Sequence, residues 1–187
     1  TAVIRQFMAD VQWGDLDFLL IDSADGHTFY QLETLRWCKK NLPVPIIAGN
    51  VVTAKAFKAL ATEKADAVKI GMGIGSGCTT QEVKATGRGQ ATAIKEIAGA
   101  RDNLAANGPY IPLIADGGIS SSAEIAIALA LGADAVAPVS PRDSSGNSLR
   151  MPPAQRSTSS ATLMRVTRAP SWIEVYWRPT RMLSWKV

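Results

Sequence analysis

The chain has 187 residues, of which 47% are hydrophobic and 19% are charged, a composition of globular rather than disordered proteins. It contains no apolar run of the roughly 18 or more residues that span a membrane, and its first residues lack the pattern of a secretory signal. The net charge of +4 comes from residues 140–187, which hold 8 basic and 2 acidic side chains against 12 and 14 in residues 1–139, so neither nucleic acid nor membrane is an expected partner.

The predicted elements alternate strands with helices. In chain order they are a strand at 18–22, a helix over 32–42, a strand at 45–49, a helix after Thr53, a strand at 67–71, a helix over 94–104, a strand at 111–116, a helix after Ser121 and a strand at 133–136. Near-continuous apolar strands between amphipathic helices predict an α/β fold in which helices cover a parallel sheet.

Several of the predicted helices carry recognisable end signals. Thr53 has the position of an N-cap, Ser121 and Glu124 have the spacing of a capping box, and Gly132 follows the last apolar turn. Cys38 falls on the apolar stripe of the first helix and is predicted to be a core residue.

An open doubly wound sheet and a closed barrel both fit this alternation. Polar or glycine residues end successive strands at Asp22, Asn50, 71–73 and 116–118. Several strands that deliver functional groups to one rim are typical of a (β/α)8 barrel. Since only five strands are visible, the predicted fold is a partial TIM barrel, roughly strands 4–8, formed by residues 1–139 and left with two open sheet edges.

Residues 140–187 differ in character from the rest of the chain. They are rich in serine, arginine and proline, and only residues 173–177 have the pattern of a strand. Three interpretations of this atypical basic tail stay open: a disordered extension, a frame-shifted or artificially joined segment, and a basic contact surface. The start at Thr1, without a methionine, suggests a fragment of a longer protein.

A glycine-rich segment at 71–80 follows a predicted strand and carries Cys78. Its glycines let the backbone approach a ligand, and nearby amide dipoles lower the pKa of a cysteine thiol. Cys78 is therefore a candidate nucleophile, although the segment by itself also fits a tight turn. The two cysteines, Cys38 and Cys78, form neither a disulfide framework nor a metal-ligand spacing, so we expect a reducing cytoplasm.

The segment Asp116-Gly117-Gly118 is a second candidate for binding. A carboxylate can hold a vicinal diol and two glycine amides can receive a phosphate, but a turn with a capping aspartate fits equally well. His27 is the only histidine, so it is predicted to be a loop residue, and a serine–histidine or multi-histidine metal site has little support.

Six motifs occur together in one order. They lie at 22–27, 48–53, 68–73, 76–82, 87–93 and 114–119. With these motifs the chain resembles the IMP dehydrogenase and GMP reductase family over roughly residues 10–137. The segments 81–82 and 87–93 favour the dehydrogenase branch.

The resemblance implies an NAD-dependent oxidation of IMP to xanthosine monophosphate, a step of guanine nucleotide biosynthesis. Cys78 would add to C2 of the hypoxanthine ring, hydride would pass to NAD, and water would hydrolyse the covalent thioimidate. Thr80 would lie beside the base and help to activate that water. For the intact family, a homotetramer is expected.

The resemblance also implies the binding residues. On the substrate side, Asp116 would bind the ribose hydroxyls and Ser76 and Gly118 the phosphate, with Gly117 and Ser140 in the same substrate-binding set. The residues implied on the cofactor side are Asp22, which would contact the NAD ribose, Ser23, Asn50, Gly71 and Gly73. The carbonyls implied for a potassium site are those of Gly73, Gly75 and Cys78.

Several departures from the family pattern concern the end of the reaction. Val139 and Ser140 stand where a Gly-Ser pair completes the phosphate site, and Gly77 replaces an isoleucine beside Cys78. Residues 140–187 contain neither the Tyr-Arg-Gly-Met-Gly-type segment that grips the purine nor the flap Arg-Tyr pair, whose arginine is the general base for hydrolysis. The regulatory CBS module is also not in this chain. We therefore expect the chain alone to be inactive, and the alternatives are a GMP reductase, a non-catalytic nucleotide-binding fragment, and a phosphate-binding barrel enzyme without cysteine chemistry.

Overall fold

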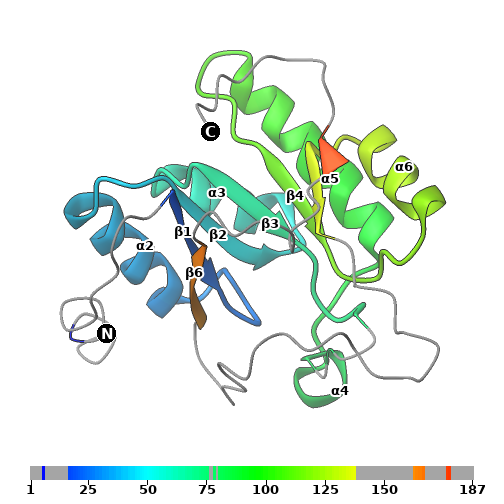
Figure 1. Cartoon of the computed structure of the whole chain (residues 1–187), viewed down its shortest axis with the longest axis horizontal. Coiled ribbons are helices and arrows are strands. Elements are labelled where there is room, and N and C mark those ends of the chain that lie inside the picture. Colours follow the sequence, from blue (N-terminus) through cyan, green and yellow to red (C-terminus); the bar gives the residue numbers. More distant parts are fainter. Residues whose placement is uncertain are drawn as a thin grey trace.

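The structure is a computed structural model that describes residue 6, residues 17–75, 78 and 80–137, and the backbone of residues 162–166 and 176–177. Its elements are shown in Figure 1. They are β1 (Phe18–Asp22), α2 (Phe29–Asn41), β2 (Ile46–Val51), α3 (Ala54–Thr62), β3 (Ala67–Ile70), α4 (Thr80–Lys84), α5 (Gln90–Ala105), β4 (Leu113–Asp116), α6 (Ser122–Ala130), β5 (Ala135–Ala137), β6 (Thr162–Val166) and β7 (Tyr176–Trp177).

Strands β1 to β5 form a parallel sheet in which each strand pairs with the next one in the chain. The register aligns Asp22 of β1 with Gly49 of β2, and Asp116 of β4 with Ala137 of β5. Because the strand order follows the chain order, all crossovers run in one direction and the helices share one face of the sheet. Helices α2, α3, α5 and α6 indeed contact one another in that order (Figure 1). The predicted α/β fold with a parallel five-stranded sheet is confirmed.

The core lies between this sheet and the helix layer. Leu19, Phe57, Ile97 and Leu113 are among its fully buried side chains. Cys38 is buried as well, as predicted from its place on the helical stripe. Burial of these apolar surfaces is the main force that holds the helices to the sheet.

The predicted helix ends are confirmed. The side chain of Thr53 accepts a hydrogen bond from the amide of Ala56, and Ser121 and Glu124 form the reciprocal capping box. After α6, Gly132 has a φ of +114°, which a residue with a side chain rarely adopts. The chain can therefore leave the helical conformation at this glycine. Among the described residues, no helix is long and apolar enough to cross a membrane.

The structure differs from the sequence-based expectation at both sheet edges and after the glycine-rich segment. Strand β6 pairs antiparallel with β1, and β7 pairs antiparallel with β5, so both edges of the parallel sheet have a partner. Of these two edge strands, β7 falls inside the range 173–177 that was predicted as a strand, and β6 was not predicted. Residues 80–84, for which no element was predicted, form the short helix α4, which is too short to show a helical period in the sequence.

A buried cation forms hydrogen bonds at the amino ends of strands β4 and β5. Arg101, on α5, is 5% exposed, and its Nη1 lies 2.6 Å from Oδ2 of Asp134 and 2.9 Å from the carbonyl of Gly132. The same Asp134 oxygen accepts the amide of Leu113 at 2.9 Å. This ion pair joins α5 to β4 and β5 at the edge opposite the candidate site.

Candidate active site

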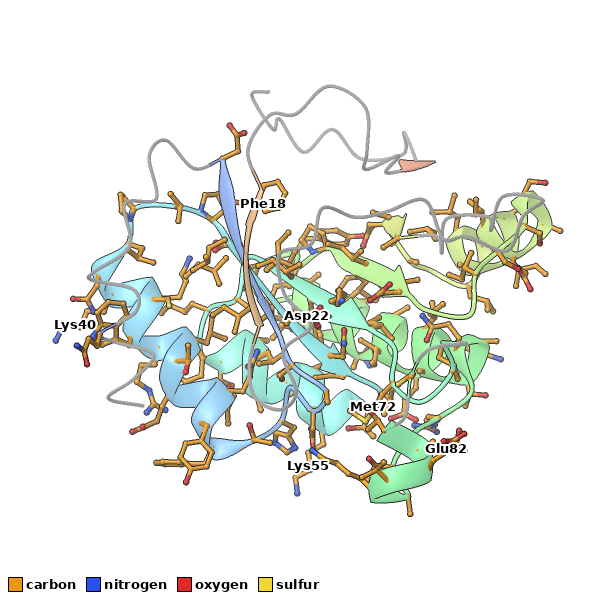
Figure 2. All side chains as sticks on the ribbon, turned by 60° about the horizontal axis from the view of Figure 1, so that its bottom comes forward. Phe18, Asp22, Lys40, Lys55, Met72 and Glu82 are labelled. Atoms are coloured by element: carbon orange, nitrogen blue, oxygen red, sulfur yellow. The ribbon has the colours of Figure 1, made fainter. Side chains whose placement is uncertain are left out.

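Charged side chains from three strands meet at the carboxyl edge of the parallel sheet. Lys69 of β3 places its Nζ 2.9 Å from Oδ2 of Asp22 on β1 and 2.5 Å from Oδ2 of Asp116 on β4. Asn50 of β2 donates its Nδ2 to Oδ1 of Asp22 at 3.0 Å. Figure 2 shows Phe18 and Asp22 at opposite ends of β1, which identifies the end of the sheet that carries this cluster. The structure thus brings together the strand-end residues Asp22, Asn50 and Asp116.

Lys69 is the one member of this cluster that the sequence did not point to. The residue is 8% exposed, whereas the side chains of Asp22 and Asp116 are 21% and 30% exposed. Desolvation lowers the pKa of the Lys69 ammonium, but the charges of Asp116 and Asp22 outweigh it and the pKa is raised overall. Lys69 is therefore a cation at this edge. The sequence signals that could have singled it out are its position in an apolar strand and its place in the motif at 68–73.

The exits of β1 and β2 are joined through their backbones. Ser23 donates its amide to the Gly49 carbonyl at 2.9 Å and accepts the amide of Asn50 at 2.9 Å, and its hydroxyl also contacts the Gly49 carbonyl at 3.3 Å. The peptide bond between Gly49 and Asn50 is cis. The Oδ1 atom of Asn50 is buried without a hydrogen-bond partner among the described residues. A buried acceptor beside Asp22 is thus available to a ligand.

Gly71 lies where β3 and β4 leave the sheet. Its φ is +146°, and an added Cβ would lie 1.8 Å from the carbonyl oxygen of Asp116. Gln90 fastens the same place, because its Nε2 donates to the carbonyls of Ile70 at 2.9 Å and Asp116 at 3.1 Å. Only glycine fits this close approach of two backbones.

The segment from Met72 to Arg88 forms a loop with a closed base, and we call it the Cys78 loop. The Arg88 amide donates to the Met72 carbonyl at 3.2 Å. A Cβ on Gly73, whose φ is +82°, would lie 3.1 Å from the Cα of Gly87. Arg88 also pairs with Glu96 on α5, which accepts the amide of Ala54 at the start of α3. The base of the loop is therefore tied to two helices.

Cys78 is partly exposed within this loop, and its amide donates to the Gly75 carbonyl at 2.9 Å. Desolvation raises the pKa of the Cys78 thiol, but hydrogen bonds from the side chain and backbone of Thr80 and from the backbone of Gly73 outweigh it. Although the Asp116 carboxylate also raises the pKa, the net effect is a lowered pKa and a larger thiolate fraction at neutral pH. Thr80 and Asp116 are thereby brought into one environment with Cys78.

The glycine pair after β4 packs against the first half of the Cys78 loop. Gly117 and Gly118 have φ values of +88° and +68°. A Cβ on Gly118 would lie 3.2 Å from the carbonyl of Ile74, and one on Gly117 would lie 3.6 Å from the Ile74 side chain. Two of the predicted substrate-binding residues, Ser76 and Ser140, lie outside the described residues.

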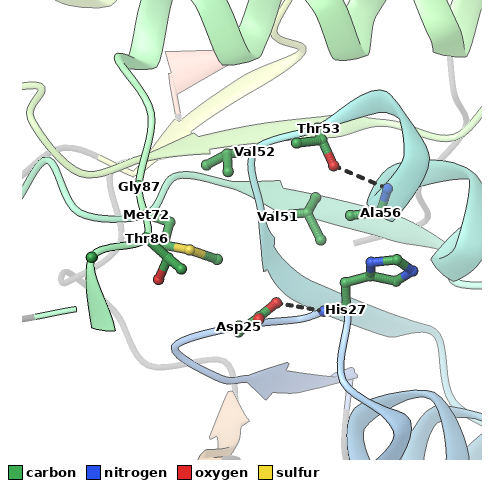
Figure 3. Close-up of a pocket in the computed structure, with 10 residues that line it drawn as sticks. Asp25, His27, Val51, Val52, Thr53, Ala56, Met72, Thr86 and Gly87 are labelled. Carbon is green, nitrogen blue, oxygen red and sulfur yellow. Dashed lines mark hydrogen bonds between the residues drawn. The ribbon is translucent and has the colours of Figure 1, made fainter. Parts of the chain in front are cut away.

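A pocket of about 330 Å³ opens beside the base of the Cys78 loop (Figure 3). Asp25 and His27 line it from the turn after β1, and Met72, Thr86 and Gly87 from the loop base. The amide of His27 donates to Asp25 at 3.0 Å, and His27 lies in a turn, as predicted. Cys78, Asp22 and Asp116 do not line this pocket, so it is distinct from the charged cluster.

The polar groups at this rim fit NAD and potassium, the two groups that the family resemblance implies. The partly exposed carboxylate of Asp22 and the unpartnered Oδ1 of Asn50 suit the hydroxyl and amide groups of a nicotinamide nucleoside. The Cys78 loop offers neutral backbone carbonyls, the ligands that replace water around potassium. The Gly75 carbonyl already accepts the Cys78 amide and keeps one lone pair.

The sequence of this chain is similar to those of known proteins. Residues 5–138 match the family model of the IMP dehydrogenase / GMP reductase domain. The inosine-5'-monophosphate dehydrogenase of Aquifex aeolicus is 50% identical over 122 residues, which are 65% of this chain and 24% of that protein. The enzymes of the same name from Caenorhabditis elegans and Trypanosoma brucei brucei are 47% and 46% identical over 65% and 64% of this chain.

The chain spans less than a quarter of the length of these curated relatives, which it covers to 22–24%. The matched region nevertheless includes every described residue of the charged cluster and of the Cys78 loop. The chain belongs to the IMP dehydrogenase / GMP reductase family.

Proposed function

We propose that residues 1–139 are part of an IMP dehydrogenase catalytic domain, in which Cys78 is the nucleophile that attacks the purine. One observation carries the proposal: the loop that bears Cys78 begins at the carboxyl end of β3, at the rim where Lys69 joins Asp22 to Asp116 and where Asn50 also lies. The lowered pKa of the Cys78 thiol agrees with this role. A nucleophile needs such activation together with groups that position the substrate. The names of the relatives support the same activity.

The fold we propose for the intact domain is a (β/α)8 barrel, of which β1 to β5 are five successive strands. A doubly wound sheet reverses its strand order at a switch point, whereas β1 to β5 follow the chain without reversal. Functional groups at the carboxyl ends of several strands also agree with a barrel rim.

In the proposed reaction each residue has a stated task. Asp116 accepts the ribose hydroxyls, and the amides of Gly117 and Gly118 face the phosphate together with Ser76 and Ser140. The Cys78 thiolate forms a bond to C2 of IMP, and the hydrogen at C2 leaves with its electron pair. Water then adds its oxygen to C2 with the help of Thr80, one of its protons going to N3 of the purine and the other to solvent; the carbon–sulfur bond breaks, and xanthosine monophosphate and the thiolate are released.

Two further groups belong to this proposal. NAD supplies the hydride acceptor, and Asp22, Ser23, Asn50, Gly71 and Gly73 are the residues that would hold it. Carbonyls of Gly73, Gly75 and Cys78 would hold a potassium ion that fixes the Cys78 loop. We also propose a cytoplasmic location, since both cysteines are free and a reducing compartment suits a catalytic thiol. For the intact protein we propose a homotetramer, as the family resemblance implies.

The proposal is tested with an IMP analogue that carries a halogen at C2. The thiolate displaces halide at C2, so peptide mapping by mass spectrometry should find the nucleotide on Cys78. Buried Cys38 is the internal control and should stay unmodified, and Cys78→Ala should take up none. An unmodified Cys78, or equal labelling of both cysteines, would contradict the proposal.

A further inference from the structure

The buried ammonium of Lys69 is the centre of the charged cluster and has no task in the reaction described above. It contacts Asp22 and Asp116, two carboxylates that are separated along the sheet by β2 and β3. The two contact distances, 2.9 and 2.5 Å, are those of charge-assisted hydrogen bonds.

The side chain of Lys69 reaches Asp22 because β2 carries a glycine next to it. An added Cβ on Gly49 would lie 2.6 Å from the Cβ of Lys69 and 2.7 Å from its carbonyl oxygen. Any larger residue at Gly49 would therefore collide with the base of the lysine side chain. The sheet is built locally so that one cation from β3 spans the neighbouring strand.

Lys69 and the two aspartates differ in exposure. Lys69 is 8% exposed, and its ammonium contacts the two carboxylates. The side chains of Asp22 and Asp116 are 21% and 30% exposed. A ligand can thus reach the carboxylates while the cation stays behind them. The raised pKa of the ammonium agrees with a charged group and not with a general base.

We propose that Lys69 is a positioning residue that fixes the two ribose-binding carboxylates, Asp116 for the nucleotide and Asp22 for the cofactor. Two carboxylates at one rim repel each other, and the shared ammonium offsets that repulsion and selects one orientation for each. The inference rests on the proposed function, since it takes the ligands of these aspartates from it. Lys69 makes a diol-specific site out of two carboxylates that would otherwise turn towards solvent.

The test compares IMP with 2'-deoxy-IMP by isothermal titration calorimetry on the whole chain. A hydrogen bond from a hydroxyl to a charged carboxylate favours IMP by about 10- to 100-fold in Kd. Lys69→Met should reduce this preference to about threefold or less, and Lys69→Arg should restore most of it. A Lys69→Met variant that binds IMP with the full preference would overturn the proposal.

Arg101→Met is the matched control, because it removes the other buried cation among the described residues, which lies on α5 and pairs with Asp134 at the amino ends of the strands. It should lower stability and leave the preference for IMP unchanged. If Arg101→Met loses the preference as well, Lys69 acts only through general stability and the positioning role is wrong. Wild-type chain that binds neither nucleotide would contradict the proposed function itself. Failure of the proposed function can thus be distinguished from failure of the positioning role of Lys69.

A measurement on unmodified chain covers the case in which Lys69→Met does not fold. The ammonium of a buried, paired lysine gives a resolvable proton–nitrogen NMR correlation, assigned here by its loss in Lys69→Arg. This signal should shift when IMP is added and shift less with 2'-deoxy-IMP at equal saturation. A signal that stays in place at saturating IMP would equally overturn the proposal.

Discussion

The two cysteines show how position decides the chemistry of a residue. Burial raises the pKa of the Cys38 thiol to about 11, and the side chain packs in the core under α2. Cys78, in contrast, has a lowered pKa because Thr80 and the Gly73 backbone stabilise its thiolate. A low-pKa, partly exposed thiol is the form that attacks an electrophilic carbon. The same residue type thus serves packing at one site and reactivity at the other.

For single residues, we predict the effect of Thr80→Val, which keeps the shape of residue 80 and removes its hydroxyl. Since the Thr80 side chain lowers the pKa of Cys78, its loss should move the pH at which alkylation of Cys78 is half-maximal to a higher value. Iodoacetamide labelling between pH 6 and 10, read by peptide mapping, measures this shift. Thr62→Val, whose hydroxyl donates only to Lys58 on α3, is the control and should leave the profile unchanged. An unshifted profile in Thr80→Val would show that the hydroxyl does not act on the thiol.

The Cys78 loop is the element that turns the end of β3 into a site. Gly71, just before this loop, lies close to the β4 backbone at Asp116, and the base of the loop is closed by the hydrogen bond between Arg88 and Met72. Two glycines therefore serve different purposes here: Gly71 permits the close approach of the β3 and β4 chain ends, and Gly73 permits the closure of the loop base.

The close approach is tested with Gly71→Ala, matched against Gly99→Ala in the middle of α5. The methyl group at residue 71 would lie 1.8 Å from the Asp116 carbonyl, so strands β3 and β4 must separate, and we expect a loss of about 2 kcal/mol or more of unfolding free energy. A methyl at Gly99 meets nothing within 4 Å and should stabilise the helix by about 0.5–1 kcal/mol. Urea denaturation followed by circular dichroism gives both unfolding free energies. A Gly71→Ala variant that is as stable as Gly99→Ala would contradict the close approach of the two backbones.

The elements that sequence patterns predict here are those specified by local residues. Apolar runs predicted β1 to β5, and Thr53 and Ser121 predicted the helix starts that the structure has. Strand β6 was not predicted, because its pairing with β1 joins residues far apart in the chain. Lys69 was missed for a similar reason: its partners lie 47 residues away in each direction, and an apolar strand does not reveal which side chains meet across a sheet.

At the scale of the whole molecule, residues proposed for the first part of the reaction are brought together at one end of the sheet, whereas the pair implied for the last part is not found in residues 140–187. The described strands β1 to β4 carry Asp22, Lys69 and Asp116, and the loop after β3 carries Cys78. The Arg-Tyr pair that the family resemblance implies for the activation of water is not found in residues 140–187. We therefore expect the 187-residue chain to form the covalent intermediate and to fail at its hydrolysis.

The most direct measurement of this account is the amount of NADH formed by a known amount of chain after rapid mixing with IMP, NAD and potassium. We predict a burst of at most one NADH per Cys78, matched by a covalent nucleotide on that residue, and then no steady-state production. Cys78→Ala should give no burst. Continued linear production near the typical enzymatic rate of about 10 s⁻¹ would contradict the predicted block at hydrolysis. No burst and no adduct in wild-type chain would contradict the role of Cys78 as the nucleophile.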